Sequence, residues 1–155
     1  MVYNESVFTL HFFDQKSGYE FVTFDKTGEM TGSTKIPKDG LSNWELQRVS
    51  ANLNSNTENV TLYPNGNKGF IRSTFAKYKK LGYEIVAYDN EAKEIWSIKS
   101  NEASSMVEMV EINDITSKYM TATVTKKKNV MTREMTNYLL LVDIEEGKVI
   151  SETKL

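Results

Sequence analysis

The segment GYEFVTFD at residues 18–25 decides the fold, because two related segments follow it along the chain. Residues 82–89 read GYEIVAYD and match the first segment at five of eight positions. Residues 136–143 read TNYLLLVD and keep the apolar run and the final aspartate. Runs rich in aromatic and β-branched residues predict strands. The sequence therefore predicts three copies of one strand, each ending in aspartate.

The aspartates Asp25, Asp89 and Asp143 each precede a short polar stretch. An aspartate side chain accepts hydrogen bonds from backbone N–H groups two residues on, which fixes a turn. Gly28 and Gly147 are suited to a backbone with positive φ in such turns. The second copy has Lys93 near this place and no glycine. These five aspartates and glycines are therefore predicted to be structural turn residues.

Strand-like runs flank each copy, so the predicted unit contains four strands. The predicted repeat units cover approximately residues 6–36, 59–100 and 106–154, with an insertion at approximately residues 37–58. No obvious innermost strand precedes the first unit. Together the units make one all-β domain, or a fragment of a longer chain.

This pattern resembles the blades of a β-propeller, which are four-stranded antiparallel sheets in series. The resemblance is generic, and no specific propeller family is assigned. Three units are fewer than the roughly four to eight blades of a closed ring. We therefore expect a partial propeller, completed by the remainder of a longer chain or by self-association. The alternative folds are a single antiparallel β-sandwich and a lipocalin-like barrel.

Composition narrows the chemistry that the chain can perform. The 155 residues include no cysteine and one histidine, so disulfides, zinc-thiolate sites and multi-histidine metal sites within one chain are excluded. The formal charge of −2 gives no strong field for nucleic acid. A membrane-spanning helix needs about 20 apolar residues, and no such run occurs. We expect no metal, no cofactor, no nucleic acid partner and no membrane span.

Few residues stand out as functional candidates, and none is assigned a catalytic role. Trp44 lies in the insertion and is the best candidate for ligand binding, because aromatic side chains bind proteins and sugars. Trp96 is expected to pack against a neighbouring unit. Glu20 and Glu84 occupy equivalent repeat positions, which indicates a shared structural role and not one active site.

The sequence is most typical of a non-catalytic β-repeat scaffold or binding module for a protein or a glycan. The first alternative is a fragment of a propeller hydrolase or lyase whose other site residues lie outside this chain. The second is a small lipid- or ligand-binding β-barrel. The abundance of Asn, Thr, Ser and Tyr is typical of a bacterial protein exported to the periplasm or cell surface. A cytoplasmic location is the alternative.

Overall fold

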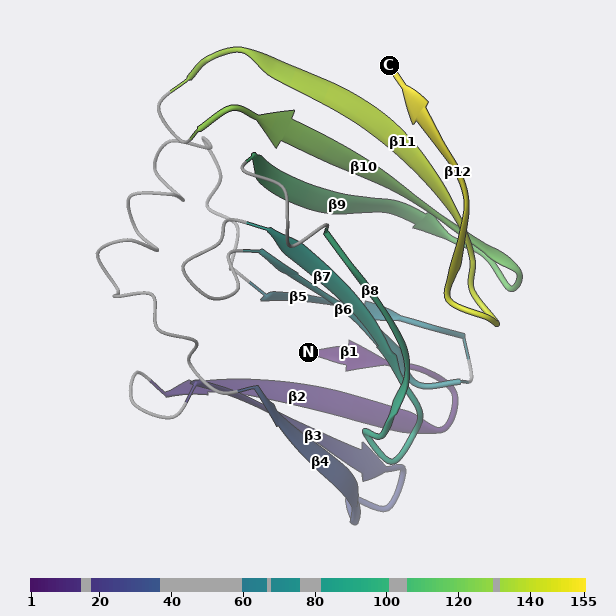
Figure 1. The fold of residues 1–155 in the computed structure, drawn as a ribbon. Helices are drawn as coiled ribbons and strands as arrows, with labels where there is room; N and C mark the ends of the chain where they lie inside the picture. The colour runs from purple at the N-terminus through teal and green to yellow at the C-terminus, as the bar shows by residue number, and fades with distance from the viewer. Residues whose placement is uncertain (15–17, 37–59, 67, 76–81, 101–105, 130–131) are drawn as a thin grey trace.

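The structure is a computed structural model that describes residues 1–14, 18–36, 60–66, 68–75, 82–100, 106–129 and 132–155. Within these residues the chain forms twelve strands in three separate four-stranded sheets, and no helix (Figure 1). None of the three sheets closes into a barrel. The all-β expectation is confirmed, while the lipocalin-like alternative does not describe these sheets. No helix in the described ranges has the length and apolar character that crossing a membrane requires.

Each sheet is a simple antiparallel meander in which strands adjacent in sequence are hydrogen-bonded neighbours. The first sheet contains β1 (Val2–Tyr3), β2 (Val7–Asp14), β3 (Gly18–Asp25) and β4 (Met30–Ile36). The second contains β5 (Val60–Pro64), β6 (Phe70–Phe75), β7 (Tyr83–Tyr88) and β8 (Glu94–Lys99). The third contains β9 (Val107–Ile115), β10 (Tyr119–Lys127), β11 (Met135–Asp143) and β12 (Lys148–Lys154).

The innermost strand of the first sheet is present, contrary to the sequence expectation. It is β1, which has only two residues and pairs with β2 through Val2 opposite Thr9. A two-residue strand is too short to show the alternation of apolar and polar residues that identifies a strand in sequence. The first sheet therefore begins at Val2 and not near residue 6.

The three sheets repeat one another in backbone detail. In each sheet, the pairing between the third and fourth strands shifts register just before the final aspartate. The shifts fall between Thr23 and Phe24, between Ala87 and Tyr88, and between Leu141 and Val142. Each shift therefore lies between the residues two positions and one position before the aspartate. Bulges bend a strand and increase its twist, so the sheets share a bend at the same place.

The aspartate turns have closely similar hydrogen bonds. The Oδ1 of Asp25 accepts the N–H groups of Thr27 and Glu29, and the Oδ1 of Asp89 accepts those of Glu91 and Lys93. In the third turn Asp143 pairs with Lys148, one position further along than the residues bonded to Asp25 and Asp89, and Asp143 Oδ1 accepts the N–H groups of Glu145 and Glu146.

Positive φ occurs in all three turns, although only two of them contain glycine. Gly28 has φ of 88° and Gly147 has φ of 66°, while Ala92 has φ of 60° in the second turn. Ala92 is buried between the first and second sheets. Lys93 in the second turn therefore does not replace the glycine of the first, because Ala92 occupies that position.

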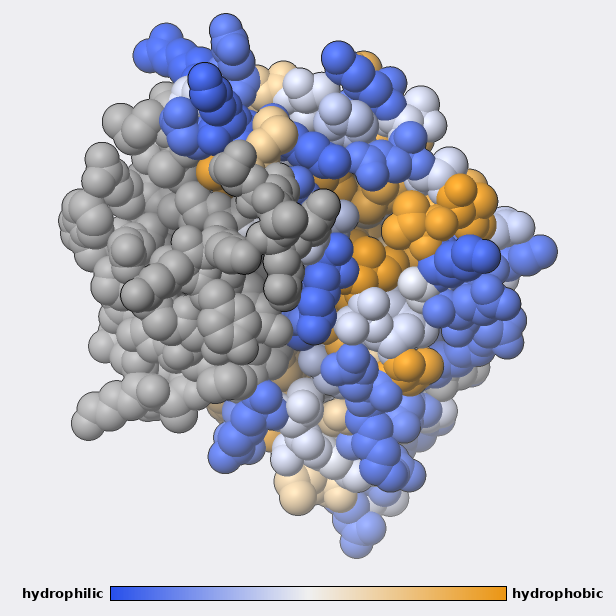
Figure 2. All heavy atoms as spheres, in the orientation of Figure 1, coloured by the Kyte–Doolittle hydropathy of each residue, from blue (hydrophilic) through white to orange (hydrophobic). Residues whose placement is uncertain are grey.

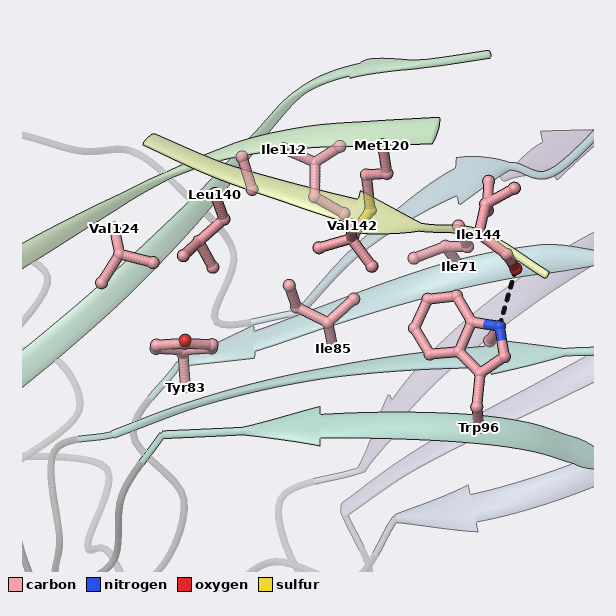
Figure 3. Close-up of a cluster of buried hydrophobic side chains, with 12 residues drawn as sticks. Ile71, Tyr83, Ile85, Trp96, Ile112, Met120, Val124, Leu140, Val142 and Ile144 are labelled. Atoms are coloured by element: carbon pink, nitrogen blue, oxygen red, sulfur yellow. Dashed lines mark hydrogen bonds between the residues drawn. The ribbon is translucent and has the colours of Figure 1, made fainter. Parts of the chain in front are cut away.

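The sheets stack in sequence order, with the second between the other two (Figure 1). One apolar cluster joins the first and second sheets and includes Phe21, Phe70 and Tyr88. A larger cluster joins the second and third sheets and includes Ile85, Trp96 and Val142 (Figure 3). Every residue of β7 is buried. The middle sheet is therefore covered on both faces, while each terminal sheet is packed on one face.

Candidate functional site: the outer faces of the stack

The outer face of the first sheet is largely apolar. Strand pairs place Tyr3 beside Phe8, Phe8 beside Phe24, and Leu10 beside Val22. Paired residues of neighbouring strands share one face. We call this surface the first outer face, and its members are Tyr3, Phe8, Leu10, Phe12, Glu20, Val22, Phe24, Met30, Ser33 and Lys35.

Several of its large apolar side chains are open to solvent. Tyr3 is 74% exposed, Met30 is 65% exposed and Phe12 is 52% exposed. The Phe8 and Phe24 rings stack with centroids 5.2 Å apart, and both residues remain half-buried. A contiguous apolar patch of this kind on a protein surface marks an interaction site.

The first outer face is equivalent to surfaces that are buried elsewhere in the stack. Phe24 directly precedes Asp25, and Tyr88 directly precedes Asp89. Phe24 stacks on Phe8 of the preceding strand, just as Tyr88 stacks on Phe70 at 4.8 Å. The Phe70–Tyr88 pair packs against Phe21 of the first sheet. The Phe8–Phe24 pair has the same place in its own sheet but faces outward.

One corner of the first outer face is charged. Glu20 Oε1 and Lys35 Nζ lie 3.6 Å apart across paired strands, and both side chains are exposed. In the second sheet Glu84 Oε1 lies 3.3 Å from Lys99 Nζ. The two glutamates therefore meet lysines at equivalent places, although only Glu84 is buried.

Glu84 also takes part in a buried ion pair with Arg72. Arg72 Nη2 donates to Glu84 Oε2 over 2.7 Å, and the two side chains are only 4% and 5% exposed. Arg72 Nε donates to the Tyr88 hydroxyl over 3.2 Å, and the guanidinium lies over the Tyr88 ring. Burial raises the pKa of Tyr88, although the positive charge of Arg72 opposes that shift. These contacts satisfy the buried charges of Arg72 and Glu84 inside the stack. We therefore assign this pair a structural role.

The outer face of the third sheet is mixed in polarity. Leu139 and Leu141 are half-buried on β11 and pair with Thr123 and Thr121 of β10. We call this surface the last outer face. Its members are Met109, Glu111, Thr121, Thr123, Thr125, Asn137, Leu139, Leu141, Ser151 and Thr153.

Side-chain hydrogen bonds order part of the last outer face. Asn113 Nδ2 donates to Thr123 Oγ1 over 3.0 Å, and Thr125 Oγ1 donates to Asn137 Oδ1 over 2.9 Å. Such bonds satisfy the polar groups within the sheet. The face can then present its threonine methyl groups and its leucines to a partner.

Trp44, the candidate for ligand binding, lies outside the described residues, as does the insertion at residues 37–58. Trp96 packs between the second and third sheets, as expected from the sequence. Sequence reasoning missed Arg72, which pairs with Val86 across strands and so shares a face with Glu84 and Tyr88. The alternation along residues 83–88 carries that signal, because it places Glu84 beside a buried apolar residue on the same face.

Comparison with known proteins gives one match. A model of a family of unknown function, DUF6770, matches residues 1–154. The chain belongs to this family. No curated protein and no solved structure matches the chain. The match to DUF6770 spans all three sheets.

Proposed function

We propose that this DUF6770 chain is a non-catalytic binding scaffold whose first outer face binds another protein. One observation carries this proposal: the first outer face is open to solvent, although the equivalent face of the second sheet is buried. Phe24 and Phe8 lie on the outward face and are half-buried, whereas their counterparts Tyr88 and Phe70 are buried.

The chemistry of the face favours a protein over a glycan. Sugar recognition combines aromatic stacking with several convergent polar groups. On the first outer face, the charged groups Glu20 and Lys35 pair with each other at one corner. The remaining surface is composed mainly of aromatic and aliphatic side chains. A protein surface with apolar side chains matches such a face, since interface cores are enriched in aromatic residues and methionine.

Site-specific photo-crosslinking in cells that express the chain tests this proposal. A photoreactive phenylalanine analogue replaces Phe12 in one variant and Ile95 in the other. The two positions are matched, because Phe12 is 52% exposed and Ile95 on β8 is 50% exposed. We expect a protein adduct from position 12 and none from position 95. The absence of any protein adduct at position 12, or equal yields at both positions, would contradict the proposal.

A further inference from the structure

The geometry points to a second copy of this chain as the partner of the first outer face, with two copies closing a six-sheet ring. In this arrangement the first outer face of each copy packs on the last outer face of the other. This inference rests on the proposed function, because it names the partner that the first outer face binds.

The repeat positions show which kind of surface fits the first outer face. In the second and third sheets, the residues one and three positions before the aspartate face the preceding sheet; they are Tyr88, Val86, Val142 and Leu140. The same positions in the first sheet are Phe24 and Val22. The first outer face therefore corresponds to a surface that receives a preceding sheet.

The last outer face corresponds to a surface that packs on a following sheet. Four residues before the aspartate, Phe21 and Ile85 each pack on the sheet that follows. Leu139 has this position in the third sheet and faces outward. Figure 3 shows Ile85 pointing toward Val142 across the junction of the second and third sheets. By equivalence, Leu139 of one copy contacts Phe8 and Phe24 of the other.

Threonines on the last outer face are compatible with this packing. In the first sheet, Thr9 and Thr23 are paired across β2 and β3 and are almost fully buried, with exposures of 1% and 0%. Thr121 and Leu141 occupy the equivalent pair in the third sheet. The first junction thus already buries threonines at this position.

At both existing junctions, a side chain of the outermost strand donates to a backbone carbonyl in the aspartate turn of the next sheet. Thr31 Oγ1 of the first sheet donates to the carbonyl oxygen of Asn90 over 2.8 Å, and Trp96 Nε1 of the second donates to that of Ile144 over 2.9 Å. Asn90 and Ile144 each directly follow a turn aspartate. The equivalent acceptor in the first sheet is the carbonyl oxygen of Lys26, which would meet β12 of the second copy.

The number of copies in the ring follows from the number of sheets in each copy. Propellers close with roughly four to eight blades, and the described residues of each copy form three sheets. Six is the only multiple of three in that range, so two copies close the ring. A contact between two different faces must close after a set number of copies, or it grows as a filament.

The area of the contacts also favours two junctions. The three long strands of the first sheet have 8, 8 and 7 residues. At about 4.8 Å between strands and about 3.3 Å per residue, they cover about 360 Å². One junction then buries about 730 Å² over both copies, which is small for a specific interface, whereas the two junctions of a closed ring bury about 1,460 Å².

Solution mass and crosslinking of the purified chain test this inference. Light scattering should give twice the chain mass of 17.7 kDa. Phe24→Lys and Leu139→Lys should each raise the chain concentration at which half of the dimer is dissociated at least about tenfold. Each variant would place a charge in the centre of a junction. Ile95→Lys, outside both faces, is the control. Circular dichroism of each variant shows that it remains folded.

Crosslinking identifies the faces, and the absence of native cysteine makes it specific. A Phe24→Cys chain mixed with a Leu139→Cys chain should give a covalent heterodimer with a short bis-maleimide. A Phe24→Cys homodimer would overturn the inference, since it would place two first outer faces together. A monomer at about 100 μM, or a mass that keeps growing with concentration, would also overturn it.

These outcomes separate this inference from the proposed function. A monomeric purified chain whose position 12 still crosslinks another protein in cells would leave the binding scaffold standing without the ring. A monomer with no adduct at position 12 would remove both.

Discussion

The indole Nε1 of Trp96 donates a hydrogen bond to the carbonyl oxygen of Ile144 over 2.9 Å (Figure 3). Trp96 lies on the outermost strand of the second sheet, and Ile144 lies in the aspartate turn of the third. Both residues are buried in the cluster between these sheets. This bond therefore fixes the position of one sheet relative to the next, and the indole ring adds apolar contact.

Figure 2 shows hydrophobic atoms in the area between β8 and β12, with hydrophilic atoms around them.

Trp96→Phe should lower the free energy of unfolding by about 2 kcal/mol. The change leaves the buried Ile144 carbonyl without this donor and removes part of a large buried side chain. Urea unfolding followed by circular dichroism measures the loss. Thr31→Val, which removes the hydrogen bond to the Asn90 carbonyl at the first junction, should cost about 1 kcal/mol. A Trp96→Phe variant as stable as the parent would show that the bond does not hold the junction.

Breaking the Arg72–Glu84 pair should be costly. Arg72→Met or Glu84→Gln should each lower the free energy of unfolding by about 3–5 kcal/mol, because each removes the buried partner of a buried charge. The double variant should lose less than the sum of the single variants, by about 1–3 kcal/mol. Denaturant unfolding of all four proteins gives this coupling.

The exposed pair Glu20–Lys35 is the matched control for that cycle. Glu20 has the position of Glu84 in the first sheet, and its partner Lys35 lies 3.6 Å away on the fourth strand. Its removal should change the free energy of unfolding by less than about 1 kcal/mol. Equal costs for the two pairs would contradict the structural role assigned to Arg72 and Glu84.

Gly147→Ala should be more harmful than Gly28→Ala. Both glycines have positive φ, which costs an alanine about 1–2 kcal/mol. A Cβ at Gly147 would also overlap the Trp96 ring, whereas a Cβ at Gly28 meets no atom within 4 Å. We expect a loss of about 2–4 kcal/mol for Gly147→Ala. Thermal unfolding ranks the two variants, and an equal loss would place the Trp96 ring elsewhere.

Stability should fall at alkaline pH through Tyr83. Burial, together with the negative charges of Glu108 and Glu152, raises the pKa of Tyr83 from 10.0 to about 12. A raised pKa contributes stability that is complete below the unfolded value of 10.0 and is lost as pH rises toward 12. In Tyr83→Phe this part of the pH dependence should be absent.

Absorbance titration of the phenolates provides a second measurement of Tyr83. Burial also raises the pKa of Tyr88, so the parent should show one more late-ionising phenol than Tyr83→Phe, with Tyr83 ionising near pH 12. Tyr3→Phe, at an exposed position, is the control and should keep every late ionisation of the parent. An unchanged number of late ionisations in Tyr83→Phe would assign the pKa near 12 to another tyrosine.

Sequence reasoning located the repeated unit because its signal is local. An apolar strand that ends in aspartate appears as a run of adjacent letters, and the structure places Asp25, Asp89 and Asp143 at equivalent turns. The short strand β1 was missed, since two residues show no periodicity. Ala92 was missed as the positive-φ residue, because its conformation depends on packing between sheets.

The candidate surface was only partly predictable. Alternation along residues 18–25 shows that Phe24 and Val22 share a face. It does not show which of the two faces packs on a neighbour, since both contain aromatic residues. That choice depends on the stacking direction, which appears only when Phe21 is seen against Phe70 and Tyr88. The Arg72–Glu84 pair was likewise hidden, because charged residues in sequence are usually solvated.

The burial of the second sheet on both faces has a consequence for how the chain comes apart. Truncating either terminal sheet would uncover one side of β7, but deleting the middle one would leave the other two without their shared support. In a separate chain, unfolding should therefore fray from the ends of the stack, and amide protons of β7 should exchange last with solvent.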